Sequence, residues 1–159
     1  MRFIFSTRSA TPNILKEDGS DYFDDGYKFV PGKDEIIRPG SNGWVVSYGE
    51  MLYRSLDAVE RLRRDGFNVG LINKPTLNVV DEEMMERIGA GDFVLVVESQ
   101  NSKTGLGSRM GTWLLERGYS PKYASLGSNK EGHGGLSEQI DHQGLASEDI
   151  RKKLHALAV

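Results

Sequence analysis

The stretch that decides the fold runs from residue 43 to residue 116 and begins Gly43-Trp44-Val45-Val46-Ser47-Tyr48-Gly49. Two further apolar runs follow at residues 68–73 and 92–98, and segments with helical spacing separate the three runs. Strands that alternate with helices of roughly 10–15 residues indicate parallel strands joined by helical crossovers. We therefore predict an α/β domain built on a mostly parallel sheet.

Four helices are expected from apolar residues at helical spacing: residues 50–65, 81–88, 108–116 and a last helix that begins at Ser147. Gly66 and Gly118 follow two of them and are the expected C-terminal stops. Ser147 is expected to cap the last helix. Acidic residues follow it directly, in the first turn, where negative charge favours a helix.

The first 42 residues differ in kind from the rest. Residues 2–6 predict a short buried strand, and residues 16–42 form a connecting arm rich in Gly, Asp, Pro and Lys, with islands of aromatic residues. Loops of this length are usually functional segments or linkers, and the aromatic islands indicate that this one packs onto another part of the protein. We divide the chain into residues 1–42, a strand with its connecting arm, and residues 43–159, the α/β domain.

Composition narrows the classes of function. A length of 159 residues fits about one domain. The chain has no cysteine, which excludes a disulfide framework and a thiolate metal site and agrees with a cytoplasmic location. No apolar run approaches the ~20 residues that span a bilayer, and the net charge of −3 is interspersed, unlike the basic stripe of a nucleic-acid surface. We expect neither a membrane nor a nucleic acid as partner.

Ligands of open α/β sheets bind beyond the carboxyl ends of the parallel strands. Tyr48 and Glu98 lie at two of these ends, but a polar residue at a strand end more often serves as a turn or cap partner. None of the strand ends offers a nucleophile–base pair, a carboxylate dyad or a metal-ligand spacing. We assign no catalytic residue and no metal site.

A glycine-rich turn, Gly105-Leu106-Gly107-Ser108-Arg109-Met110-Gly111, opens a predicted helix, where backbone amides can bind phosphate. The spacing is not that of the dinucleotide fingerprint, and no P-loop lysine follows. Close packing of the helix on the sheet is the preferred interpretation, with nucleotide binding as the alternative. The histidines at 133, 142 and 155 make no metal set, and both Trp44 and Trp113 are expected in the core.

Taken in order, several blocks resemble the C-terminal domain of transketolase-type, thiamine-diphosphate-dependent enzymes. The blocks are Thr7-Arg8-Ser9-Ala10-Thr11-Pro12, residues 45–51, residues 71–81, Val96-Val97-Glu98 with residues 104–108, and the tail from Gly134 to Leu145. The resemblance covers nearly the whole chain. It implies a three-layer α/β/α sandwich with a mostly parallel five-stranded sheet and one antiparallel strand. It also implies that residues 1–42 start at the end of a pyrimidine-binding domain.

The resemblance also implies a function, the transfer of a two-carbon ketol unit between sugar phosphates by the complete enzyme. In the family, the arginine of the first block helps to bind the substrate phosphate, so Arg8 is the one position carried over. A guanidinium suits this role because it can donate two parallel charged hydrogen bonds.

The family's motif for the cofactor diphosphate and Mg²⁺ is missing from this chain, as is the glutamate that activates the cofactor. The resemblance thus implies that thiamine diphosphate and Mg²⁺ bind in the complete enzyme and not to this chain alone, which we expect to be inactive by itself. The expected partners are the upstream diphosphate- and pyrimidine-binding domains, a second copy in a homodimer, and a sugar-phosphate substrate.

Other interpretations stay open. The same domain occurs in deoxyxylulose-phosphate synthases and in 2-oxoacid dehydrogenase β-subunits, although the Arg-x-x-x-Pro spacing favours transketolase. A free-standing, non-catalytic module of this fold that binds a partner protein or a small ligand is the alternative from another class.

Overall fold

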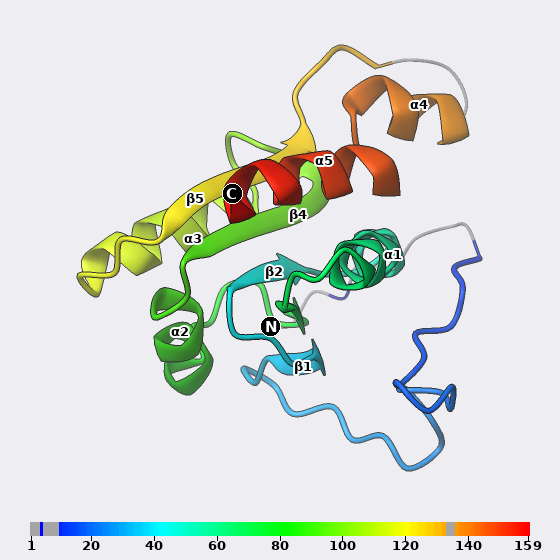
Figure 1. Ribbon diagram of the computed structural model, residues 1–159, viewed down its shortest axis with the longest axis horizontal. Coiled ribbons are helices and arrows are strands. Elements are labelled where there is room, and N and C mark those ends of the chain that lie inside the picture. Colours follow the sequence, from blue (N-terminus) through cyan, green and yellow to red (C-terminus); the bar gives the residue numbers. More distant parts are fainter. Residues whose placement is uncertain (1–3, 5–9, 133–135) are drawn as a thin grey trace.

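The computed structural model describes residue 4 and residues 10–132 and 136–159. Its centre is one five-stranded sheet in the order β1-β3-β2-β4-β5 (Figure 1). β1 pairs antiparallel with β3, and all other neighbours are parallel. The strands are β1 (Glu35–Arg38), β2 (Gly43–Ser47), β3 (Val69–Asn73), β4 (Phe93–Asn101) and β5 (Lys122–Ser128). The predicted mostly parallel sheet with one antiparallel strand is confirmed.

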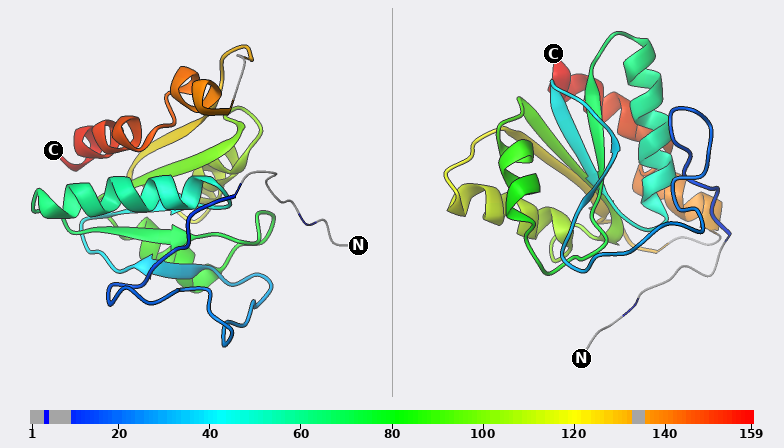
Figure 2. Two further views of the ribbon diagram at one scale, coloured as in Figure 1. Left: turned by 90° about the vertical axis from the view of Figure 1, so that its right-hand side faces the viewer. Right: turned by 90° about the horizontal axis from the view of Figure 1, so that it is seen from below.

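Helices cover both faces of this sheet (Figure 2). α1 and α5 lie on one face, and α2 and α3 lie on the other. The helices are α1 (Met51–Arg64), α2 (Glu82–Gly89), α3 (Leu106–Glu116), α4 (Leu136–Gln143) and α5 (Ser147–Ala158). The protein is thus a three-layer α/β/α sandwich, as the sequence and the resemblance predicted.

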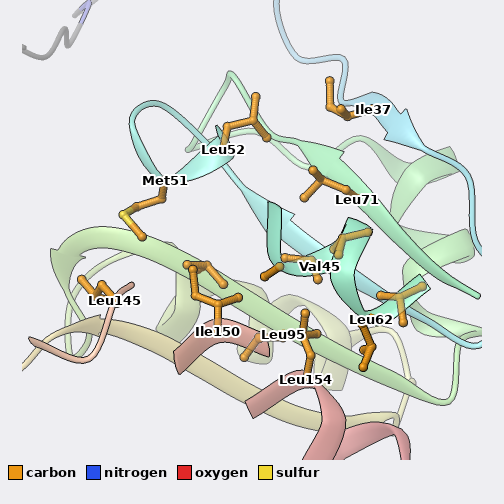
Figure 3. Packing of buried hydrophobic residues seen from close by; sticks show 14 of the residues in the cluster. Ile37, Val45, Met51, Leu52, Leu62, Leu71, Leu95, Leu145, Ile150 and Leu154 are labelled. Atoms are coloured by element: carbon orange, nitrogen blue, oxygen red, sulfur yellow. The ribbon is translucent and has the colours of Figure 1, made fainter. Parts of the chain in front are cut away.

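Alternation along the strands divides the core into two halves, because successive strand residues point to opposite faces of a sheet. Val45, Leu71 and Leu95 pack beneath α1 and α5 (Figure 3). Their neighbours Val46 and Ile72 pack instead with the apolar residues of α2 and α3. Trp44 is buried in this second half, and Trp113 packs against it, so the core placement predicted for the two tryptophans is confirmed.

Two helices end as the glycine pattern predicted. Gly66 and Gly118 have φ of 93° and 77°, values that suit a residue without a side chain. The amides of Gly66 and Phe67 donate to Arg63 and Leu62 of α1. The equivalent pair of bonds closes α3. Both ends are Schellman motifs, in which a glycine just past the helix satisfies its last free carbonyls.

The prediction for the start of α5 was wrong in detail. Ser147 is the first residue inside the helix, the capping position belongs to Ala146, and no side chain caps this end. The acidic first turn of Glu148 and Asp149 is present as expected, so the favourable charge at the helix dipole remains.

Residues 1–42 contain an element that the sequence pattern did not indicate. Within the connecting arm, residues 16–42, β1 forms the antiparallel edge of the sheet next to β3. Of the strand predicted at residues 2–6, the structure describes only Ile4, which is 95% exposed and outside any strand. The rest of that prediction lies outside the described residues. No helix in the described part of the chain is both long and apolar enough to cross a bilayer.

The packing of β4 under α1 and α5 leads to a stability prediction. Leu95 is fully buried, so Leu95→Ala leaves a cavity and should lower the free energy of unfolding by about 2–5 kcal/mol. Leu115 on α3 is 73% exposed, so the control Leu115→Ala should change it by less than about 0.5 kcal/mol. Urea unfolding of both variants measures the difference, and equal losses would contradict this packing.

Candidate functional site

A broad hollow of about 1570 Å³ lies at the carboxyl ends of the parallel strands. Its walls come from the end of β2, the segment after β3, the start of α3 and the connecting arm. Tyr48 and Asn73 line it at the ends of β2 and β3, Gly105 lines it at the start of α3, and Phe29 lines it from the arm. This is the edge where ligands of open α/β sheets bind, so we call it the carboxyl-end hollow and take it as the candidate site.

The side chain of Glu98, a residue of β4, lies at the start of α3 beside this hollow. Its side chain is fully buried. Oε2 accepts a hydrogen bond from the amide of Leu106, and Oε1 accepts one from the amide of Gly107, both at 2.8 Å. A carboxylate bound by two amides at a helix N-terminus is favoured by the helix dipole. The prediction that Glu98 is a cap partner is confirmed.

Close neighbours on β4 and β5 explain two glycines of the turn. A Cβ at Gly105 would come within 2.2 Å of Glu98 Oε2, and one at Gly107 would come within 2.6 Å of Ser125 Cβ on β5. The Gly105 amide itself donates to the carbonyl of Asn101 at 2.8 Å. The amides of residues 105–107 are therefore all bonded within the protein. The turn serves close helix–sheet packing, as preferred, and does not offer these amides to a phosphate.

Tyr48 joins the same group from β2. Its hydroxyl donates to Glu98 Oε2 at 2.9 Å, so one carboxylate on β4 ties the end of β2 to the start of α3. Burial raises the pKa of the Tyr48 hydroxyl far above its usual value, and the Glu98 charge adds to the rise. Tyr48 therefore stays protonated at neutral pH and acts as a hydrogen-bond donor.

A buried ion pair fastens the connecting arm to the sheet. Lys74 follows β3 and is fully buried. Its Nζ lies 3.0 and 3.1 Å from the two oxygens of Asp34, which is 2% exposed, and 2.8 Å from the carbonyl of Val79. All three ammonium donors are thus used. The ammonium also lies 5.6 Å from the ring centre of Trp113, within range of a cation–π contact.

Further bonds hold the same part of the arm. The Asp34 amide donates to Asp81 Oδ2 at 3.0 Å, and Lys33 Nζ donates to Asp81 Oδ1 at 3.1 Å. The Gly32 amide donates to the Thr76 hydroxyl at 2.9 Å. Asp81 stands at the start of α2, yet its side chain makes no cap bond with that helix. It binds the arm instead.

Burial has an electrostatic consequence for this ion pair. It raises the pKa of Asp34 from 3.8 to about 6, although the Lys74 charge pulls that pKa down. Desolvation of the carboxylate therefore outweighs its attraction to the ammonium. The sequence analysis missed both residues. The signal that could have found Lys74 is a lysine that follows four apolar or small residues and Asn73 at the end of a buried strand.

The structure brings Tyr48 and Glu98 together, and the glycine-rich turn lines the hollow through Gly105, Leu106 and Arg109. The described histidines do not line it. His155 lies on α5 against the ring of Phe67, and His142 lies on α4. His133 and Arg8 fall outside the described residues, so the role of Arg8 stays a prediction. Within residues 10–132 and 136–159, no group of three or more His, Asp or Glu side chains could hold a metal ion.

Comparison with known protein families decides the classification. The family model described as "Transketolase, C-terminal domain" matches residues 32–150. The chain belongs to this family. The match begins inside the connecting arm, just before β1, and takes in all five strands of the sheet. The resemblance read from the sequence blocks is thereby confirmed.

Several curated members of the family share about a third or less of their matched residues with this chain and are longer than it. An uncharacterized transketolase family protein of Sinorhizobium fredii is 33% identical over 116 residues, covering 72% of this chain and 32% of its own length. One of the subunits of apulose-4-phosphate transketolase from Actinobacillus succinogenes is 30% identical, and the match covers 67% of this chain and 36% of that subunit. A 1-deoxy-D-xylulose-5-phosphate synthase of Bacillus licheniformis is 27% identical, and the match covers 82% of this chain and 21% of the synthase. The chain thus spans about a third or less of these relatives.

A solved structure shows the same fold. It is described as a split-gene transketolase in the form of an inactive β4 tetramer, and it superposes with a TM-score of 0.81 at 22% identity. The superposition covers 95% of this chain and 48% of the other. The transketolase C-terminal fold therefore accounts for nearly the whole chain.

Removal of the Glu98 charge tests the group at the start of α3. Glu98→Gln turns one acceptor oxygen into an amide that faces an N–H donor, so it should lower the free energy of unfolding by about 2–3 kcal/mol. The matched control Glu86→Gln, exposed on α2, should cost less than about 0.5 kcal/mol. Chemical denaturation measures both, and an unchanged Glu98→Gln variant would refute the capping role.

The raised pKa of Asp34 predicts a pH dependence with a definite sign. The folded protein holds this proton more tightly than the unfolded chain, so the Asp34 contribution to stability is greatest at low pH and is lost as the pH rises through about 6. Wild type should therefore lose stability relative to Asp34→Asn between about pH 4 and pH 6. Asp25→Asn, an exposed change in the same arm, should leave the wild-type profile unaltered. Parallel profiles for wild type and Asp34→Asn would contradict the shift.

Proposed function

We propose that this chain is the C-terminal domain of a thiamine-diphosphate-dependent transketolase-type enzyme. The complete enzyme moves a two-carbon ketol unit between sugar phosphates, and this domain supports the pyrimidine-binding domain, the dimer and the substrate phosphate. The observation that carries the proposal is the family match over residues 32–150. The split-gene transketolase and the apulose-4-phosphate transketolase relative support it, since in both the fold is part of an assembly of chains.

The described residues do not fit the cofactor. They contain no group of three or more His, Asp or Glu side chains that could hold a metal ion, and the α3 amides that could bind a diphosphate are bonded to Glu98 or Asn101. We therefore assign thiamine diphosphate and Mg²⁺ to the upstream domains of the complete enzyme. The roles left to this chain are structural, with Arg8 as its contact to the substrate phosphate. Homodimer formation and a cytoplasmic location belong to the same proposal.

Reconstitution tests the proposal. The purified chain should show no heat of binding with thiamine diphosphate and Mg²⁺ in isothermal titration, and no ketol transfer. Addition of the diphosphate- and pyrimidine-binding domains encoded with it should produce both. Ketol transfer by the chain alone would refute the proposal. No cofactor binding in either case would favour the free-standing binding module.

Arg8 gives the same proposal a sharper test in the reconstituted enzyme. Loss of a bidentate charged contact should raise the KM for a phosphorylated sugar about tenfold or more in Arg8→Ala, with a smaller effect on kcat. Arg64→Ala, which removes an exposed arginine at the end of α1, serves as the control and should leave both constants unchanged. Equal KM values for the two variants would remove Arg8 from the phosphate site.

A further inference from the structure

A second pocket, of about 280 Å³, lies at the opposite edge of the sheet from the carboxyl-end hollow. One wall is the turn between β1 and β2, and the other is the end of α2 with the turn that leads into β4. The pocket shares no described lining residue with the hollow, and we call it the amino-end pocket. Its volume is just below the ~300–1,000 Å³ usual for ligand pockets, so a small molecule fits it.

The indole N–H of Trp44 is an unused hydrogen-bond donor at this pocket. Trp44 lines the pocket and is only 6% exposed, yet no described residue accepts a hydrogen bond from its Nε1. Nε1 itself is not cut off from solvent. The ring edge that carries it lies beside Gly91, another lining residue, where a Cβ would come within 3.5 Å of Nε1. Because a buried tryptophan usually finds a partner for its N–H, this one points to an acceptor supplied by a ligand.

The direction of this donor is fixed by close packing of the Trp44 ring. Trp44 pairs in register with Gly70 of β3, and a Cβ at Gly70 would come within 2.3 Å of Trp44 Cζ3. On the opposite edge of the ring, a Cβ at Gly91 would come within 3.0 Å of Cδ1. The indole is therefore held between two glycines before anything binds. A donor ordered in advance loses less entropy on association.

Arg87 of α2 adds a charged donor to the same pocket. Its described ion-pair partner is Glu83, one turn earlier, with a shortest N–O distance of 3.6 Å. That distance is longer than a hydrogen bond, so the guanidinium keeps its donors for a ligand. Ser41, on the other wall, accepts a hydrogen bond from Asn68 Nδ2 at 2.9 Å and keeps its own hydroxyl proton to donate. The polar side chains of the pocket therefore offer donors.

A cation fits this pocket poorly. No acidic residue is among the described residues that line it. The end of a helix can attract a cation through its free carbonyls, but two of those at the end of α2 are in use. The carbonyls of Glu86 and Ile88 accept hydrogen bonds from the amides of Ala90 and Gly91. The pocket thus favours a ligand that accepts hydrogen bonds and carries negative charge.

We propose that the amino-end pocket binds a small organic carboxylate. The carboxylate lies between the Arg87 guanidinium and the Trp44 N–H, because a guanidinium can donate two parallel charged hydrogen bonds to it. The apolar part of the ligand packs against Ile36, Pro39 and Ala90, which supply the apolar side chains of the pocket. This inference is independent of the proposed function, since it concerns the edge of the sheet away from the carboxyl-end hollow.

Titration of the whole chain with benzoate tests the site. The readout is the pair of indole N–H signals in nitrogen-15 NMR spectra, which Trp113→Phe assigns. The Trp44 signal should shift in a saturable way, and the Trp113 signal should stay in place, because Trp113 does not line this pocket. Benzamide has the same ring without the charge and should bind at least tenfold more weakly. Inorganic phosphate, which has no apolar part, should also bind more weakly than benzoate.

Matched variants identify the residues that hold the ligand. Arg87→Ala should weaken benzoate binding about tenfold or more, because it removes the charged donors. The control Arg64→Ala removes an exposed arginine of α1 that does not line the pocket and should bind like wild type. Glu83→Gln removes the carboxylate that competes for Arg87 and should tighten binding about twofold to fivefold. Thermal melts confirm that each variant is folded.

Three results would overturn the proposal. One is the absence of a saturable shift of the Trp44 signal in the wild-type chain. The second is benzoate binding that Arg87→Ala leaves unchanged, which would place the ligand elsewhere. The third is phosphate binding as tight as that of benzoate, which would remove the apolar contacts and with them the assignment to an organic carboxylate.

Discussion

The buried carboxylate of Glu98 is the interaction on which the carboxyl edge of this fold depends. It places a negative charge at the start of α3, where it accepts hydrogen bonds from two amides of that helix. It also accepts a hydrogen bond from the hydroxyl of Tyr48, which follows β2. Three elements that meet at the carboxyl end of the sheet are thereby fixed to one side chain. That side chain leaves no room for a Cβ at Gly105, and Ser125 of β5 leaves none at Gly107, so these two glycines follow from packing within the protein.

The connecting arm is the second organising feature of that edge. A buried ion pair is a costly way to attach a loop, since desolvation offsets much of the attraction. Lys74 and Asp34 nevertheless give the attachment a single register, because the ammonium has three acceptors at fixed positions and no others are needed. The arm therefore acts as a wall of the carboxyl-end hollow as much as a connection into β1.

The sequence predicted the strands and helices that show a regular spacing of apolar residues. It missed the features that depend on contacts between residues distant in sequence. The runs at β2, β3 and β4 and the glycine stops at 66 and 118 were read correctly because each signal is local. β1 and β5 were not indicated individually, since edge strands with mixed burial carry little pattern. Glu98 could be foreseen as a cap partner. The Lys74–Asp34 pair could not, because 40 residues separate its members.

That separation has a consequence for how the chain folds. The bonds between the arm and the segment after β3 join residues 40 to 48 positions apart, whereas α1 and the parallel strands it connects are close neighbours in sequence. Contacts with large sequence separation require closure of a long loop before they yield any stabilisation. The bonds of the arm therefore carry the entropy cost of closing a long loop, as does the Tyr48–Glu98 bond at the same edge, whose members lie 50 residues apart. We expect both groups of bonds to form late in folding.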